Sequence, residues 1–175
     1  MTVGIFSGLR ERLAGPFYQV NIAEIVNAVS EKPDEMDNIY CLMDDKEQKV
    51  AWRAAWICEK LSELHPEWFI PKQNDLLERL FSCQHDGTKR ILLSTLYNLP
   101  NPEPYSVPFL DYTLDHMLDP KESIAVQASC IKLAYRLCRI DPDLLDELKL
   151  RLESVDQHLY SAGVKSAIKN VLKKI

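Results

Sequence analysis

The sequence is poor in glycine, with five in 175 residues, although it holds ten prolines. Tight hairpins and phosphate-cradling loops depend on glycine, because its backbone adopts positive φ angles at little cost. So few glycines disfavour a protein built from hairpins or from such loops. The sequence also contains no G-x-G-x-x-G, G-x-x-x-x-G-K-[S/T], G-x-S-x-G or H-E-x-x-H motif. Nucleotide-loop enzymes, hydrolases and zincins therefore lack their sequence signatures.

Paired cysteines and long apolar runs are missing as well. The five cysteines are odd in number and include no C-x-x-C pair, which argues against a disulfide framework and a zinc site. No run approaches the roughly 18 apolar residues of a membrane span. The start, Met1–Arg10, has no basic residue before its short apolar run and lacks the hydrophobic core of a secretory signal. We therefore expect a protein of the reducing cytoplasm, with no bound metal and no other cofactor.

Positive charge is in the minority, with 21 Lys and Arg against 26 Asp and Glu, so that the net charge is −5. A general nucleic-acid binder neutralises phosphates with an excess of cations. This balance therefore disfavours nucleic acid as a partner. The hydrophobic share of 46% and the charged share of 27% are those of a folded domain rather than of a disordered chain.

A repeat of 38 residues is the strongest pattern in the sequence. Pro66, Pro104 and Pro142 follow one another at this spacing, each after an apolar helical run. Steps of 38 residues from five apolar positions between Val50 and Leu61 reach 20 positions in four segments, and 18 of these are hydrophobic. The chain average of 46% would give about nine. A phase that holds across four segments predicts a repeat array.

Each repeat contains two helical segments, a first helix and a second helix. The apolar offsets 0, +4, +7, +8 and +11 define one face of the second helix. The first helix follows a proline or an acidic start, and proline is tolerated in a first turn. No strand-like alternation competes with these patterns. The predicted helix pairs are 34–43 with 46–64, 69–82 with 86–99, 105–119 with 122–140, and 143–155 with 161–174.

A two-helix unit of about 40 residues cannot bury its own apolar face, so neighbouring units must stack. The predicted fold class is all-α, a right-handed α-α superhelix that forms a solenoid of about four two-helix repeats. We expect a single domain over 1–175, with the four units of the 38-residue register in 34–175. Residues 1–33 form an N-terminal extension and cap, in which Val20–Val29 predicts a helix after an irregular lead.

Three segments carry a family resemblance. Asp44–Leu61 has an acidic turn, a valine, small residues and a leucine, and it resembles the second helix of a HEAT or armadillo-like repeat. His85–Leu96 and Pro120–Leu133 resemble this helix more loosely. The run Arg53–Pro71 is similar to a group of small, functionally uncharacterised bacterial HEAT-like proteins. The resemblance covers about residues 34–175 and implies an α solenoid, but a shared fold does not supply a function.

A stripe of aromatic and charged residues lies opposite the predicted core of the second helices. At about 100° per residue, Trp52 and Trp56 point away from the apolar face of helix 46–64. Second helices line the concave surface in HEAT-like arrays, so we expect a binding groove along this stripe. The alternative is that residues 1–33 cover both tryptophans. The candidate binding residues are Trp52, Arg53, Trp56, Glu59, Arg90, Tyr97, Lys132, Tyr135 and Arg139.

The leading hypothesis is a non-catalytic interaction module or scaffold that binds a protein or peptide along this stripe, because aromatic and arginine side chains often dominate interfaces. The alternative is an enzyme that resembles the HEAT-like DNA glycosylases acting on alkylated bases. Trp52, Arg53 and Trp56 are suggestive residue types for that chemistry, whereas Glu59 and the net charge of −5 stand against it.

Two further patterns deserve a structural test. Asp111, Asp115, His116 and Asp119 lie on one predicted helix, where the i, i+4 and i+8 spacing brings the three carboxylates into a line that could hold a metal, although such a line is ordinarily a solvated face. The last helix carries apolar residues that no following repeat covers, so self-association through the end of the array is a third hypothesis. These residues are Ile168, Val171, Leu172 and Ile175.

Overall fold

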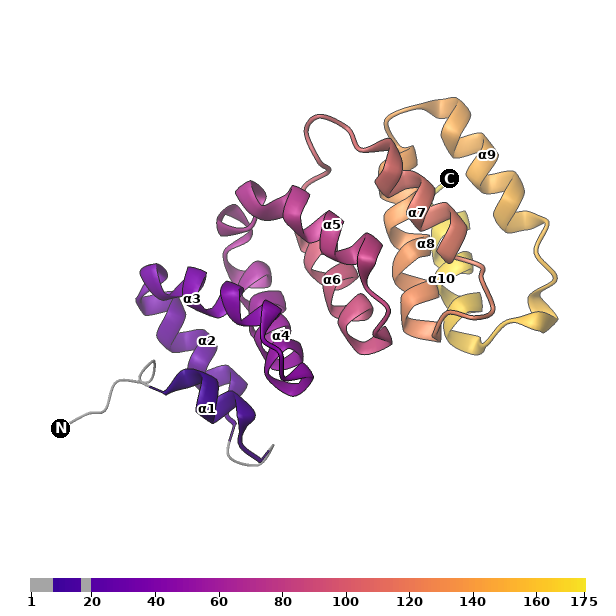
Figure 1. Cartoon of the computed structure of the whole chain (residues 1–175). Helices are drawn as coiled ribbons and strands as arrows, with labels where there is room; N and C mark the ends of the chain where they lie inside the picture. The colour runs from indigo at the N-terminus through magenta and orange to yellow at the C-terminus, as the bar shows by residue number, and fades with distance from the viewer. Residues whose placement is uncertain (1–7, 17–19) are drawn as a thin grey trace. The chain divides into compact units, whose positions relative to one another are not determined.

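A computed structural model describes residues 8–16 and 20–175 (Figure 1). These residues form α-helices and short 3-10 helices, and they contain no strand. The chain divides into two compact units, Met1–Pro71 and Lys72–Ile175. The first unit holds α1 (Leu9–Ala14), α2 (Ile22–Glu31), α3 (Met36–Cys41) and α4 (Gln48–Leu64). The second holds α5 (Gln73–Ser82), α6 (Asp86–Asn98), α7 (Val107–His116), α8 (Ile124–Cys138), α9 (Pro142–Glu153) and α10 (Ala162–Leu172).

The first unit is organised around α4, which packs against α1, α2 and α3. Its apolar residues Val50, Ile57 and Leu61 are fully buried. The helix predicted over Val20–Val29 is present as α2, which begins where the Asn21 side chain accepts a hydrogen bond from the Glu24 backbone amide at 3.1 Å.

The irregular lead predicted before α2 is wrong, because Leu9–Ala14 forms α1. Leu9 and Leu13 lie four residues apart on one side of this helix, and both are buried. Six residues are too few for a helical period to stand out in a sequence. The helix is stabilised by packing on α4 rather than by its own propensity.

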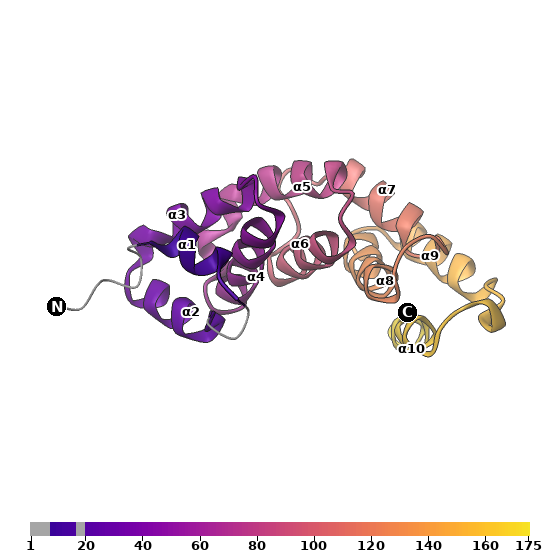
Figure 2. The same ribbon diagram turned by 60° about the horizontal axis from the view of Figure 1, so that its bottom comes forward.

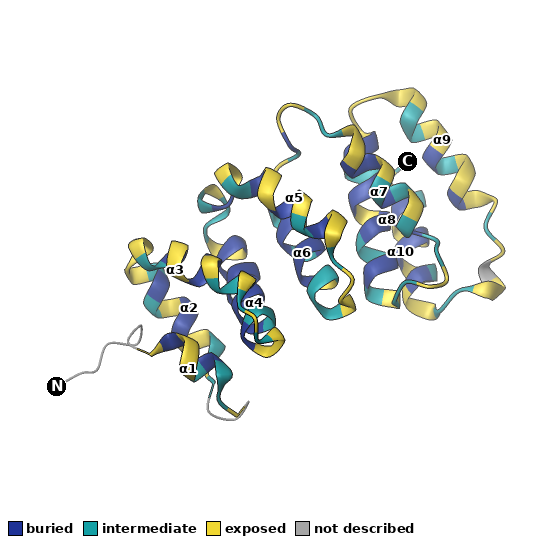
Figure 3. Cartoon of the chain, viewed as in Figure 1, coloured by how far each residue is buried: buried dark blue, intermediate teal, exposed yellow. Residues whose placement is uncertain are grey.

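The second unit contains three first helices, α5, α7 and α9, and three second helices, α6, α8 and α10. The second helices pack in a row, with α8 in contact with both α6 and α10 (Figure 2). The first helices lie along one side of this row, where α5 packs on α6 and α7 packs on α8. Because α8 also contacts α9, its buried residues form the centre of the core (Figure 3).

Side-chain caps fix where these helices begin. The His85 ring nitrogen accepts from the Thr88 amide at the start of α6, at 3.1 Å. Ser123 and Ser161 cap α8 and α10 in the same way. Proline stands in the first turn of α7 and α9, where its missing N–H has no helical partner to lose. The turn residues of the sequence therefore set the register of the helices.

The repeat positions identified in the sequence form the core of both units. Of the 20 positions reached by steps of 38 residues, 17 are buried, and Thr88, Leu172 and Ile175 are half-buried. At the end of the chain, Ile168 and Val171 are buried, and α10 packs on α8 and α9. This burial removes both residues from the exposed end face that the self-association hypothesis requires. Among the described residues, no helix is both long and apolar enough to cross a membrane.

The core register can be tested at Leu137, which is 0% exposed on α8. We expect Leu137→Ala to lower the free energy of unfolding by about 2–5 kcal/mol, because it leaves a cavity among packed helices. Leu150→Ala on α9 is the matched control, since Leu150 is 68% exposed and its truncation costs less than about 0.5 kcal/mol. Urea titration of both variants measures the difference. Equal losses would show that the register is wrong.

Candidate functional site

The predicted binding stripe is divided between the two units. Trp52, Arg53, Trp56 and Glu59 belong to α4 in the first unit. Arg90 and Tyr97 belong to α6, Lys132 and Tyr135 belong to α8, and Arg139 directly follows α8 in the second unit. The two sets differ in exposure: Arg53 and Glu59 are buried, whereas Arg90, Lys132 and Arg139 are exposed.

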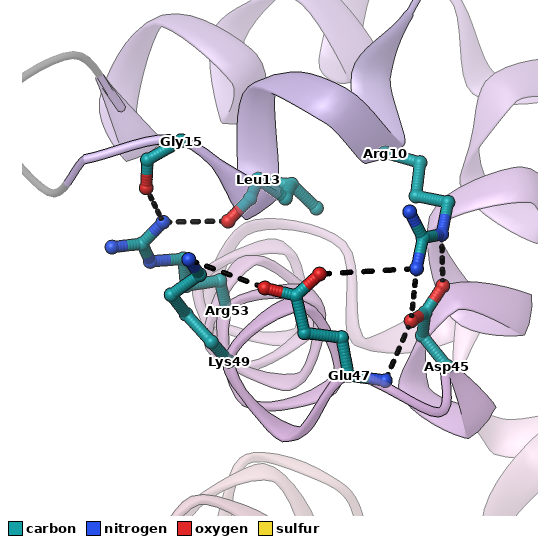
Figure 4. Close-up of polar contacts among 7 residues, drawn as sticks. All are labelled: Arg10, Leu13, Gly15, Asp45, Glu47, Lys49 and Arg53. Atoms are coloured by element: carbon teal, nitrogen blue, oxygen red, sulfur yellow. Dashed lines mark hydrogen bonds and ion pairs between the residues drawn. The ribbon is translucent and has the colours of Figure 1, made fainter.

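Arg53 is buried, with 4% of its surface exposed. Its Nη1 donates hydrogen bonds to the backbone oxygens of Leu13 and Gly15, the latter at 2.6 Å (Figure 4). These oxygens belong to the end of α1, where helical carbonyls lack partners within the helix. Arg53 therefore joins α4 to α1, and its prediction as a groove residue is wrong because the unforeseen helix α1 covers it.

A second arginine ties the same helix to the turn before α4. Arg10 bonds both carboxylate oxygens of Asp45, at 2.6 and 2.9 Å (Figure 4). The Arg10 guanidinium, together with the Glu47 amide, holds the pKa of the Asp45 carboxyl below its usual value. Polar contacts thus hold both ends of α1 in place: Arg10 bonds the turn before α4, and Arg53 of α4 bonds the end of α1.

The two tryptophans are half-buried, and their ring centroids lie 5.5 Å apart. Trp56 lines a hollow of about 400 Å³ whose other wall includes Ile22 and Val26 of α2. Trp56 therefore lies beside the N-terminal extension, as the alternative that residues 1–33 cover the tryptophans requires. Glu59 is 8% exposed and lies 3.2 Å from the Lys60 amine, so it contributes little to an open groove. The trio that suggested a DNA glycosylase does not form an open surface, because Arg53 is covered.

In the second unit, four predicted residues line one cavity of about 480 Å³. Tyr97 comes from α6, Lys132 and Tyr135 come from α8, and Arg139 follows α8. We call it the basic cavity. Its lining also includes three cations that were not on the predicted list, Arg136, Lys173 and Lys174, and three residues of α10: Ala167, Asn170 and Val171. Arg90 is exposed but does not line the cavity.

Arg136 positions the cavity wall. Its guanidinium donates to the carbonyl oxygens of Tyr97 at 2.7 Å, Leu99 at 2.8 Å and Leu96 at 3.0 Å, all at the end of α6. The Cζ atom also lies 5.4 Å from the centroid of the Tyr97 ring. Burial lowers the pKa of Arg136, but an arginine stays charged because its ordinary value is above about 12. Arg136 thus joins α8 to α6 much as Arg53 joins α4 to α1.

Charge is segregated within the second unit. Residues 72–175 contain fourteen Lys and Arg and fourteen Asp and Glu, so the unit is neutral as a whole. The second helices α6, α8 and α10 nevertheless contain a single acidic residue, Asp86. The first helices carry eight: Asp75, Glu78, Asp111, Asp115, Asp143, Asp146, Glu147 and Glu153. The net charge of the chain therefore conceals a local positive field at the basic cavity.

A polar cluster in the second unit was not foreseen from the sequence. Glu122 Oε1 lies 2.6 Å from the Lys89 amine and 2.7 Å from His116 Nδ1, and Tyr112 stacks on His116. The cluster links α6 and α7 to the turn before α8. His116 is therefore engaged with Glu122, and no group of described residues has the composition of a metal site.

Burial raises the pKa of the nearby Cys130 thiol to about 12, which keeps it protonated and unreactive.

The role assigned to Arg53 can be tested by truncation. We expect Arg53→Ala to lower the free energy of unfolding by about 2–3 kcal/mol, because it leaves two backbone oxygens of α1 without a charged donor. The control is Arg90→Ala, whose side chain is exposed on α6. Thermal and urea unfolding measure both variants. An Arg53→Ala cost no larger than that of the control would return Arg53 to the list of exposed binding residues.

Comparisons with known proteins agree with this architecture. No curated protein and no solved structure gives a significant match. A family model described as a HEAT repeat domain matches residues 9–175, which is nearly the whole chain. HEAT repeats generally serve as protein-interaction scaffolds. The extent of this match shows that the chain belongs to the HEAT repeat family.

Proposed function

We propose that this protein is a non-catalytic interaction module that binds a protein or peptide on the second-helix face of its second unit. One observation carries the proposal: Tyr97, Lys132, Tyr135 and Arg139, selected from the sequence as binding residues, line a single cavity. Tyrosine and arginine are residue types that often dominate protein interfaces. The cavity volume of about 480 Å³ suits side chains of a partner.

The lining of the basic cavity supports binding rather than catalysis. The described residues that line it include no histidine, cysteine, serine or carboxylate. These four types supply most pairs of nucleophile and base, or of general acid and general base, and the cavity lining offers only tyrosine, lysine and arginine in their place. The glycosylase alternative gains no support from this cavity, because an acidic residue of the kind that chemistry needs does not line it.

The remaining candidate residues fit the same function less directly. Trp52 and Trp56 are partly exposed and stay candidate contacts of the first unit, whereas Arg53 serves its internal structure.

The five cysteines are free thiols, and three of them, Cys58, Cys130 and Cys138, are buried. This state favours the reducing cytoplasm as the place of action.

Photo-crosslinking in the native cell tests the proposal. A photoreactive amino acid at Tyr97, which is 47% exposed, is expected to capture a discrete protein that mass spectrometry identifies. The same group at the more exposed Leu150 of α9 is the control. Adducts that match at both positions, or adducts that disappear on nuclease treatment, would contradict a protein-binding function.

A further inference from the structure

We infer that the basic cavity binds an acidic peptide segment, so that the partner presents clustered Asp or Glu side chains to it. This inference rests on the proposed function, because it specifies the chemistry of the ligand at the same surface.

Four cations of the cavity lack a carboxylate partner within the described part of the chain. Lys132, Arg139, Lys173 and Lys174 are all exposed, and none of them forms an ion pair there. Arg136, by contrast, donates to three carbonyl oxygens at the end of α6, those of Leu96, Tyr97 and the capping residue Leu99. Like charges gathered around one cavity repel each other, and a ligand carboxylate would relieve that repulsion.

Helix dipoles do not account for so many cations. The ends of α8 and α10 each present about half a negative charge, which favours a basic residue nearby. Two such ends amount to about one charge. The four cations exceed this amount, so most of the positive charge at the cavity remains available to a ligand.

The tyrosine rings favour a peptide over nucleic acid. Arg139 and Lys174 lie 6.0 and 5.8 Å from the centroid of the Tyr135 ring, and Arg136 lies over Tyr97. Single-stranded nucleic acid gains much of its affinity by stacking bases on aromatic rings. Because cations occupy these rings, a base would have to displace them. A carboxylate needs no ring face and bonds the same arginine through two oxygens.

The acidic first helices point to the same ligand. Helices α5, α7 and α9 carry eight carboxylates against the three cations Arg79, Lys149 and Arg151, so the excess of positive charge lies on the second-helix side of the unit. A long polyanion that extends beyond this side would meet repulsion. A short acidic segment places its charges on the basic cavity alone.

Fluorescence anisotropy with a labelled poly-glutamate peptide tests the inference on the full chain. We expect saturable binding that weakens with salt, because exposed charges are screened within about 8 Å at physiological ionic strength. The Lys132→Glu/Arg139→Glu variant is expected to weaken binding by at least about tenfold, since the loss of one charge-assisted hydrogen bond corresponds to roughly that factor. The Lys173→Glu/Lys174→Glu variant, at the two residues that directly follow α10, is expected to weaken binding by a similar factor.

The control variant is Lys121→Glu/Lys149→Glu, which changes the net charge equally at residues that do not line the cavity. It is expected to bind like wild type. Unfolding midpoints verify that each variant is folded. Equal weakening in the control, or no binding of the peptide by wild type, would overturn the inference. Tighter binding of a single-stranded oligothymidine at the same residues would also overturn it, in favour of nucleic acid.

These outcomes are distinguishable from failure of the proposed function. A discrete protein crosslinked at Tyr97, together with no affinity for poly-glutamate, would retain a protein partner and reject an acidic one. Absence of both would reject the proposed function itself.

Discussion

The constraint on which the structure depends is that a two-helix unit cannot bury the apolar face of its second helix by itself. Neighbouring helices must supply the cover, and in the second unit α8 obtains it from α6, α7, α9 and α10. In the first unit α4 obtains it from α1, α2 and α3. Burial of 17 of the 20 repeat positions follows from this arrangement. The opposite side of each second helix is then free to vary in chemistry.

The two units use that free side differently. In the first unit α1 covers part of it, and Arg53 turns inward to the α1 carbonyl oxygens. In the second unit the side stays accessible, with Lys132 and Arg139 exposed at the basic cavity. Arg136 shows that a guanidinium on a second helix can bond the end of the preceding second helix while its neighbours Lys132 and Arg139 stay exposed. The acidic residues of the second unit are placed mainly on the first helices and in the turns.

Much of the fold could be predicted from the sequence, because a phase repeated at 38 residues distinguishes a shared core from a single amphipathic helix. The same phase also identifies Tyr97 and Lys132, because both occupy the side of the second helices opposite that core. Helix α1 could not be found, because six residues carry no clear period. The burial of Arg53 follows from α1 and was therefore missed. Lys174 was missed because it lies beyond the predicted stripe, and only the packing of α10 on α8 brings it to Tyr135.

On the proposed function, a partner binds to the second-helix face of the second unit. Backbone NMR of the ¹⁵N-labelled protein, titrated with the partner identified by crosslinking, tests it most directly. Binding at the basic cavity is expected to change the chemical shifts of residues 132–139 and 170–174, with little change along α9. Changes confined to α9, or to the first unit, would contradict it.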